Sequence, residues 1–404
     1  MVAGQKSAEV VNALDVGRGL AIVAVMYGHA LSPWFMLSGD SFSEAAFLQW
    51  KFGAAYMMAF FFFLSGIGWR SNRSLAAACQ QGLSLLVIAW LANVGFDVLR
   101  VALTLTGVTN ALGVEGLSVG EFVRHALRLA LLSDKYSLGA MWFLAVLGLI
   151  RIIAAFAVRG GKQATVLVTL ALIALSIVAN QYYWRNVFQI LLLGVAFPFF
   201  IAGYALREVW ERAERRPLTC AVIGVVSGVL TFATYGLNQG CRWNPLHACG
   251  SGWLNGHFGV SMINGEYGNW MLFTLTAVAG TVFASCMALL LARFGARAGA
   301  ALAHWGKVSM DLLIVNSFFV VLIGPPMTIW LAPKLPAQGL LFFLALLAAT
   351  LIFNLSVRAL LARPLKRLRL FSKHVAIAIV SSVTRSIEAL AVMQRDYRVS
   401  RGND

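Results

Sequence analysis

The sequence predicts an all-α membrane protein with about ten transmembrane helices. Hydrophobic residues make up 60% of the 404-residue chain, charged residues only 12%, and the mean hydropathy is +0.78. Apolar runs of about twenty residues recur along the chain, and a run of that length crosses the hydrocarbon core of a bilayer as a helix. A soluble domain is excluded, because such domains carry roughly twice this share of charged residues.

Ten apolar blocks are long enough to span a membrane. They cover residues 17–37, 54–71, 76–99, 139–158, 164–183, 186–206, 217–237, 270–292, 308–332 and 337–361. No internal repeat or low-complexity linker divides them. We therefore interpret residues 1–361 as one membrane domain with ten helices and residues 362–404 as a basic tail.

Lys and Arg are distributed unequally between the two sides of this arrangement. With the N-terminus in the cytoplasm, roughly three quarters of the 32 Lys and Arg residues fall on the cytoplasmic side, which is the side where loops are enriched in them. The excess persists when the tail is left out. Both termini are predicted to be cytoplasmic, and the first span, which lacks a signal-peptide cleavage pattern, is predicted to be retained.

The net charge of +16 lies along the cytoplasmic rim and in the tail after Arg358. No nucleic-acid-binding motif accompanies it, so anionic lipid headgroups are the expected partners and nucleic acid is not. The tail contains the basic segment KRLRLFSK and then the apolar segment VAIAIVSSV, which is too short to span a bilayer. An amphipathic helix on the cytoplasmic surface is expected, with partial disorder as the alternative.

Two long segments lie on the opposite side. Residues 100–138 include EFVRHALRLALL, whose apolar spacing predicts a short interfacial helix. Residues 238–269 contain Cys241 and Cys249, eight positions apart on the side where a disulfide can form, so this pair is a disulfide candidate. The neighbouring histidines have irregular spacing, and no metal site is predicted.

Arg18 and His29 are the most informative residues of the first span. Eleven residues return an α-helix to nearly the same face, roughly 16 Å further along its axis. With Arg18 at the membrane surface, His29 lies near the middle of the bilayer, where an ionisable residue is a functional candidate by default. Pro33 follows four residues after His29, so the His29 carbonyl loses its helical partner and a bend is predicted there.

The second span supplies partners for this pair. Phe60 to Phe63 form an apolar wall suited to line a narrow slot, and Ser65 and Gly66 follow. Arg70 and Arg73 then share one helix face at the same end as Arg18. Three converging guanidinium groups would suit phosphate groups, and a buried histidine beyond the slot could act as a general base. The sequence favours catalysis over simple anchoring of the helix ends.

These residues resemble the integral membrane acyltransferase-3 family, which acylates extracytoplasmic glycans. The matching features are the spacing from Arg18 to His29, FFxxSG at Phe61, Phe62, Ser65 and Gly66, and RxxR at Arg70 and Arg73. Weaker matches are MWFL at Met141 to Leu144 and GKVSMDLLIVN at Gly306 to Asn316. Asn316 stands where relatives often have His. No hydrolase-like domain follows the tenth span.

The resemblance implies that an acetyl or other short acyl group moves from cytoplasmic acyl-CoA to a hydroxyl of an extracytoplasmic polysaccharide or lipid-linked glycan, in a bacterial inner membrane. His29 is then the catalytic residue at the transfer site. The implied donor-binding residues are Arg18, Arg70, Arg73, Phe61, Phe62 and Ser65. The donor substrate would be acetyl-CoA, and no metal is implied. A separate extracytoplasmic protein or a second copy of the chain is a further candidate partner.

Three residues are weaker candidates on the acceptor side. Asp311 is expected either to polarise His29 or contact the acceptor, or else to pair with a cation such as Lys307 four residues before it. Asn316 follows five residues later. Trp142 belongs to an outer group of aromatic residues that either form the interfacial belt or stack on sugar rings. The alternative function is a glycan or small-solute transporter or flippase, which predicts repeat symmetry and paired midplane charges.

Overall fold

The structure, a computed structural model, is built from helices. It describes residues 11–36, 42–71, 74–107, 115–132, 136–182, 184–238, 240, 259–332, 334 and 338–401, with side chains as far as residue 389. Within these residues the only β-type pairing is an isolated bridge between Ser261 and Glu266. Cys241, Cys249 and Arg73 lie outside the described residues, so the predicted disulfide and the role of Arg73 stay predictions.

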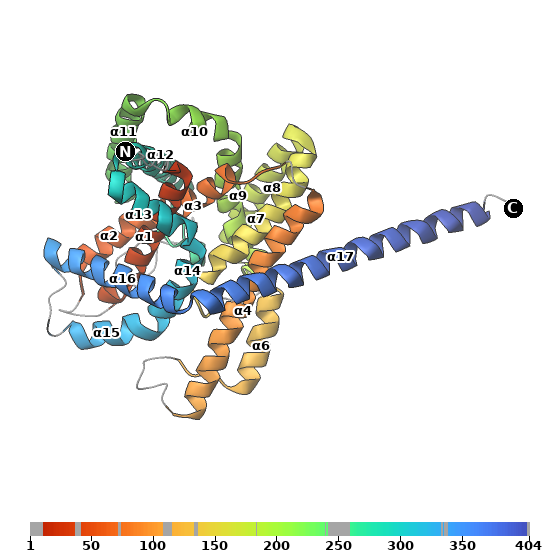
Figure 1. The fold of residues 1–404 in the computed structure, drawn as a ribbon, viewed down its shortest axis with the longest axis horizontal. Coiled ribbons are helices and arrows are strands. Elements are labelled where there is room, and N and C mark those ends of the chain that lie inside the picture. The colour runs from red at the N-terminus through yellow and green to blue at the C-terminus, as the bar shows by residue number, and fades with distance from the viewer. Residues whose placement is uncertain are drawn as a thin grey trace, which may run out of the picture.

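Figure 1 shows the arrangement of the helices. Their bounds are α1 (Ala13–Phe35), α2 (Glu44–Ala54), α3 (Met57–Ile67), α4 (Leu75–Leu105), α6 (Val119–Ala130), α7 (Met141–Arg159), α8 (Gly161–Gln181), α9 (Ile190–Ala205), α10 (Arg207–Ala213), α11 (Pro217–Tyr235), α12 (Trp270–Phe294), α13 (Ala296–Lys307), α14 (Ser309–Phe318), α15 (Gly324–Leu331), α16 (Leu340–Leu360) and α17 (Ala362–Arg401). Ten segments of the described chain are long and apolar enough to cross a membrane, which confirms the ten predicted blocks.

The second span begins earlier than the hydropathy pattern predicts. It runs from Glu44 to Ile67 and consists of α2 and α3, which are separated at Ala55 and Tyr56. The Ser43 side chain caps α2 by accepting a hydrogen bond from the Ala46 N–H at 3.2 Å. Polar residues inside α2 lower its hydropathy, which is why the apolar block starts only at residue 54 in the sequence.

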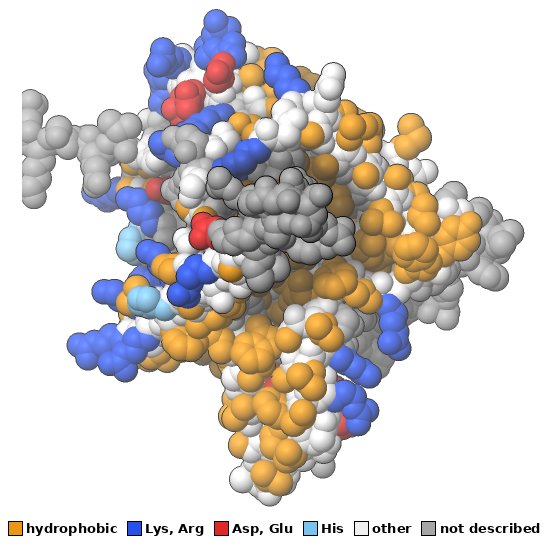
Figure 2. Space-filling view, turned by 90° about the vertical axis from the view of Figure 1, so that its right-hand side faces the viewer, with side chains coloured by type: hydrophobic (Ala, Val, Ile, Leu, Met, Phe, Trp, Pro, Cys, Tyr) orange, Lys and Arg blue, Asp and Glu red, His pale blue; other side chains and the backbone are white. Residues whose placement is uncertain are grey.

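Burial separates the central helices from the peripheral ones. In the most apolar 18-residue window of α7, 67% of the residues are buried, compared with 17% in α8. The exposed side chains of α8 and α11 are mainly Val and Leu, which is the composition that faces lipid. Figure 2 shows hydrophobic side chains over the lower part of the molecule, whereas Lys and Arg gather along its left and upper margins.

Helices α3 and α9 approach each other through glycine. A Cβ atom at Gly66 would overlap the backbone carbonyl of Phe200, and one at Gly203 would overlap the carbonyl of Phe63. Small residues allow such close contact between helices in a membrane, where the hydrophobic effect does not drive helices together. The Ser-Gly step after the phenylalanine wall therefore fixes the position of α3 in the bundle.

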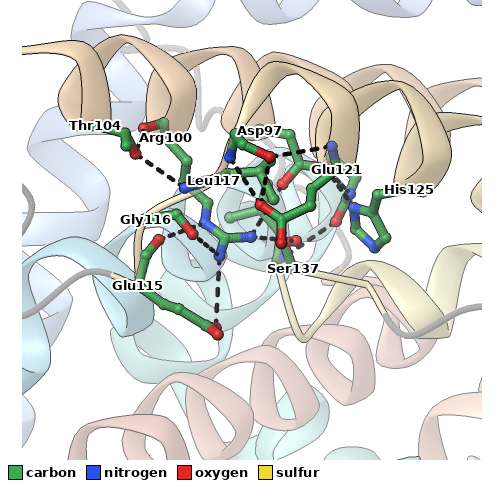
Figure 3. Close-up of polar contacts among 12 residues, drawn as sticks. Asp97, Arg100, Thr104, Glu115, Gly116, Leu117, Glu121, His125 and Ser137 are labelled. Atoms are coloured by element: carbon green, nitrogen blue, oxygen red, sulfur yellow. Dashed lines mark hydrogen bonds and ion pairs between the residues drawn. The ribbon is translucent and has the colours of Figure 1, made fainter.

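A polar network joins the outer end of α4 to the segment that follows it (Figure 3). The Asp97 carboxylate is fully buried and lies 3.4 Å from Arg100 Nη1 and 2.7 Å from His125 Nδ1. The Arg100 guanidinium also donates to the Glu115 carbonyl at 3.0 Å and to the Ser137 hydroxyl at 3.1 Å. The helix predicted in this segment is present as α6, and this network holds it against α4.

We expect Gly66→Ala to destabilise the fold by roughly 1–3 kcal/mol, because the methyl group would push α3 away from α9. Gly95→Ala on α4 is the matched control, since a Cβ there meets nothing within 4 Å. Thermal unfolding of the purified protein in detergent would compare the two. An equal melting temperature for both variants would contradict the close approach.

We expect Asp97→Asn to cost roughly 3–5 kcal/mol, because it leaves buried cationic donors without their anion. Glu115→Gln removes a carboxylate that also lies near Arg100, at 3.5 Å, but is 93% exposed, so its loss should cost at most about 1 kcal/mol. Thermal unfolding curves of the two variants would test this difference. A larger effect of Glu115→Gln would show that the buried network is not what holds α6.

Candidate functional site

Helix α1 carries Arg18 and His29 into two different cavities. The Asn12 side chain caps the helix by accepting from the Leu14 N–H at 2.9 Å. Asp15 follows in the first turn, and its carboxylate lies 3.3 Å from Arg18 Nη1. Eleven residues later His29 lines a second cavity. The spacing of eleven residues therefore places the two polar side chains of α1 in separate cavities.

The first cavity, which we call the cationic cavity, has a volume of about 550 Å³. Five basic side chains from four helices line it: Arg18 of α1, Arg151 of α7, Lys307 of α13, and Arg369 and Lys373 of α17. Amide and hydroxyl groups of α4 complete its polar wall: Gln80, Gln81 and Ser84. Such a cavity can bind a ligand with several anionic groups, which the guanidinium groups can contact in bidentate fashion.

Two glycines set the geometry at the Arg18 end. A Cβ atom at Gly68, directly after α3, would come within 2.5 Å of Arg18 Nη2, so the guanidinium lies across a backbone position that has no side chain. A Cβ at Gly306 would overlap the Asp15 carbonyl. This close packing of α13 on α1 brings the following residue, Lys307, to the rim of the cavity.

The predicted donor-binding residues separate into three groups. Arg18, Phe61 and Ser65 line the cationic cavity. Phe62 is buried behind it, with its ring 4.9 Å from that of Phe143. Arg70 is exposed beyond the end of α3 and is not among the residues that line the cavity. Among the described residues, the positive charge of this cavity therefore comes from Arg18, Arg151, Lys307, Arg369 and Lys373 and not from Arg70.

The second cavity, which we call the histidine cavity, has a volume of about 560 Å³. Its wall is rich in aromatic and amide side chains, namely Tyr27, Gln49, Trp50, Tyr56, Trp142 and Tyr235. The Tyr27 hydroxyl donates to Gln49 Oε1 at 2.6 Å, which links α1 to α2 across the cavity. Trp142 therefore lies beside the same cavity as His29.

Residues 260–263 form one side of the histidine cavity, and polar contacts hold the loop that contains them. The Tyr267 hydroxyl donates to the Leu191 carbonyl at 2.8 Å. Burial raises the pKa of Tyr267, so this donor keeps its proton. The Asn238 side chain donates to the Tyr267 carbonyl at 2.8 Å. The wall contributed by this loop is therefore fixed against α9 and the end of α11.

Asn316 of α14 is the hydrogen-bond partner of His29. Its carbonyl oxygen lies 2.6 Å from His29 Nδ1. An amide oxygen can only accept, so Nδ1 donates and Nε2 carries the free lone pair of the neutral ring. This arrangement orients the imidazole and leaves Nε2 able to accept a proton. Asn316, predicted from the sequence only as a weak candidate on the acceptor side, thus contacts the catalytic candidate directly.

The Ser32 side chain replaces the helical hydrogen bond that Pro33 cannot donate to the His29 carbonyl. Helix α1 continues through Pro33 to Phe35, and the His29 carbonyl accepts a hydrogen bond from the Ser32 hydroxyl at 2.9 Å. The carbonyl that proline leaves without an N–H partner is therefore satisfied.

The element that faces this part of α1 is also irregular. A turn of π-helix at Phe319–Ile323 follows α14, and α15 then begins at Gly324 with prolines in its first turn.

An aromatic layer separates the two cavities. Phe61 and Phe143 line the cationic cavity, and Trp142 lines the histidine cavity. The Phe61 and Phe143 ring centroids are 5.1 Å apart, and Phe62 lies 6.4 Å from Trp142. We call these four residues the aromatic partition. The two cavities share no lining residue among the described residues, and the rings of the partition connect the wall of one cavity to the wall of the other.

Asp311 does not contact His29. Its buried carboxylate lies 3.4 Å from Arg369 Nη1 and 3.7 Å from Arg358 Nε. Lys307, the cation expected as its partner, instead lines the cationic cavity. The expectation that Asp311 polarises His29 is wrong because α14 carries Asp311 at the cationic end and Asn316 at the histidine end. Its ionic partners come from α16 and α17.

Sequence reasoning missed several residues of the two cavities. Arg151 lies inside a predicted span, and a charge at that depth is itself a signal of function that could have found it. Arg369 and Lys373 belong to a tail that composition alone connects with lipid headgroups. The described residues contain no group of three or more His, Cys, Asp or Glu side chains that could hold a metal ion.

One of the comparisons with known proteins gives a match. The model of the acyltransferase-3 family, described as an acyltransferase domain, matches residues 11–358. Neither the curated proteins nor the solved structures give a significant match. The matched region contains both ends of α1 and the α14 helix that holds His29, and it ends before α17 begins. The chain belongs to the acyltransferase-3 family of membrane proteins.

Proposed function

We propose that the protein transfers an acetyl or other short acyl group from acyl-CoA to a hydroxyl of an extracytoplasmic polysaccharide or lipid-linked glycan. Family membership supports an acyltransferase. The observation that carries the finer proposal is the pair of cavities along α1, one cationic and one containing His29, whose walls are connected by the rings of the aromatic partition. A reaction between substrates from opposite sides of a membrane requires such an arrangement.

The donor in this proposal binds in the cationic cavity. CoA carries several phosphate groups at one end and a thioester at the other end of a slender arm. The basic side chains would bind the phosphates, and the arm would extend along Phe61 and Ser65 toward the partition. Arg18 and His29 are roughly 16 Å apart along the α1 axis, so the two ends of one extended donor can reach both. Exposed Arg70 would attract the donor from solution.

The unequal distribution of Lys and Arg supports a cytoplasmic location for the cationic cavity. Its lining helices α1, α7 and α13 contribute Arg18, Arg151 and Lys307, which belong to the side with the excess of positive charge. The histidine cavity would then open toward the outside, in the inner membrane of a bacterium. Cytoplasmic acyl-CoA and an external glycan would approach His29 from opposite directions.

The chemistry in this proposal is general base catalysis by His29. Nε2 accepts the proton of the acceptor hydroxyl while the hydroxyl oxygen bonds to the thioester carbonyl carbon. Collapse of the tetrahedral intermediate breaks the carbon–sulfur bond, and the CoA thiolate leaves and takes up the proton from the imidazolium. The Asn316 carbonyl oxygen, which accepts from Nδ1 at 2.6 Å, stabilises the imidazolium that forms in between. No metal takes part.

The walls of the histidine cavity suit a sugar acceptor. Trp50, Trp142 and Tyr235 supply aromatic faces, and Gln49 and Tyr27 supply hydrogen-bonding groups. Sugar rings stack on aromatic side chains and bind amide and hydroxyl groups. A glycan hydroxyl that enters between α2 and the 260–263 loop would therefore meet His29.

Replacement of His29 tests the base. We expect His29→Gln to lower glycan acylation by roughly 10²- to 10⁴-fold, because the proton acceptor is lost. His304→Gln is the matched control, since His304 is exposed on α13 and lines neither cavity. Mass spectrometry of surface glycans from cells that produce each variant at equal levels gives the measurement. Acylation that persists at the wild-type level in His29→Gln would contradict the mechanism.

Replacement of Arg151 tests the donor cavity. We expect Arg151→Gln to raise the KM for acetyl-CoA by about tenfold or more, as for the loss of a charge-assisted contact. The KM for the glycan should not change. Lys162→Ala, an exposed cation at the start of α8, serves as the control. Initial rates in membrane vesicles would show the split. A change in the glycan KM alone would place the donor elsewhere.

A further inference from the structure

We propose that the C-terminal helix α17 is part of the donor site and that Arg369 and Lys373 recognise the phosphate groups of the CoA nucleotide. This inference rests on the proposed function. It extends the site to a segment beyond the family match, which ends at residue 358. The tail would then determine donor specificity, in addition to any contact that it makes with lipid.

Helix α17 is packed against the body of the protein along its first half. It crosses α4 and then projects away from the other helices, as Figure 1 shows. Leu365 is 5% exposed, and Ser372 and Ala376 are fully buried. These positions recur at intervals of seven and four residues, so they form one helix face. The segment from Leu365 to Ala376 is therefore a fixed part of the structure.

The two cations of this segment lie beside that buried face. Arg369 and Lys373 are four residues apart and line the cationic cavity together. Gln80 and Gln81 of α4, the helix on which α17 packs, line the same cavity. An anionic ligand in this cavity would meet α17 on one side and α1, α7 and α13 on the others.

A buried ion pair fixes the position of Arg369. The Asp311 carboxylate is 1% exposed, and it lies between Arg369 Nη1 at 3.4 Å and Arg358 Nε at 3.7 Å. Arg358 belongs to the last turn of α16 and Arg369 to the third turn of α17, so one carboxylate of α14 holds both sides of the α16–α17 junction. The Arg369 side chain as a whole is still 37% exposed, and it lines the cationic cavity, where a ligand can reach it.

The same short helix connects the two ends of the site. Asp311 on α14 holds α17 at the cationic cavity, and Asn316 on α14 holds His29 at the other cavity. The donor-binding cations of α17 and the imidazole are therefore positioned by residues five apart on one helix. This connection fixes the position of α17 relative to His29. The distance between the α17 cations and the imidazole is therefore set by the protein, as binding the two ends of one donor molecule requires.

The test compares CoA with pantetheine, which has the same thiol arm but no phosphate or nucleotide. The full-length protein in detergent, as wild type and as the double variant Arg369→Gln and Lys373→Gln, is titrated with each compound by calorimetry. We expect the double variant to bind CoA at least about tenfold more weakly and to bind pantetheine with an unchanged Kd. Arg385→Gln, on the exposed part of α17, is the control and should bind both compounds like the wild type.

Asp311→Asn provides a second variant that leaves both cations in place. Loss of the carboxylate should release Arg369 and reproduce the weaker CoA binding in part, again without an effect on pantetheine. CoA binding by the double variant with the wild-type Kd would overturn the inference, and so would an equal loss of pantetheine binding. A wild-type protein that binds no CoA would instead overturn the proposed function.

Discussion

The hydrogen bond from His29 Nδ1 to Asn316 Oδ1 joins the two elements on which the site depends. Helix α1 carries the imidazole and, eleven residues earlier, the Arg18 guanidinium. Helix α14 carries the amide that orients the imidazole and, five residues earlier, the Asp311 carboxylate that holds α17. If this contact were lost, the imidazole could rotate and the lone pair of Nε2 would no longer have a fixed direction.

The two cavities differ in physical character, as the proposed function requires of sites for two different substrates. Basic side chains in the first cavity can neutralise phosphates, whereas the second cavity offers aromatic faces and a few hydrogen-bonding groups. The aromatic partition between them contains no ionisable group. A narrow apolar wall of this kind excludes water and ions and strengthens the electrostatic interactions on either side. It can admit a small acyl group more readily than a phosphate.

The sequence predicted the ten spans and the separation of Arg18 from His29 because both follow from periodic geometry. A bilayer requires about twenty apolar residues per helix, and eleven residues return to one helix face. The Asn316 contact could not be predicted in this way, since it joins residues 287 positions apart in the chain. Asp311 does pair with cations, as one of the two expectations had it, but they are Arg358 and Arg369 rather than Lys307, for the same reason. Arg369 and Arg358 reach it through the turn between α16 and α17, which hydropathy does not describe.

The most direct test of the two-sided arrangement uses membrane vesicles inverted so that the cationic cavity faces the outside medium. Acetyl-CoA labelled with ¹⁴C in the acetyl group is added to that medium, and the label on glycans inside the vesicles is counted. Transfer through the His29 site predicts label on the enclosed glycans with wild-type protein and none above background with His29→Gln. Label that appears only on glycans in the outer medium would contradict transfer between the two cavities.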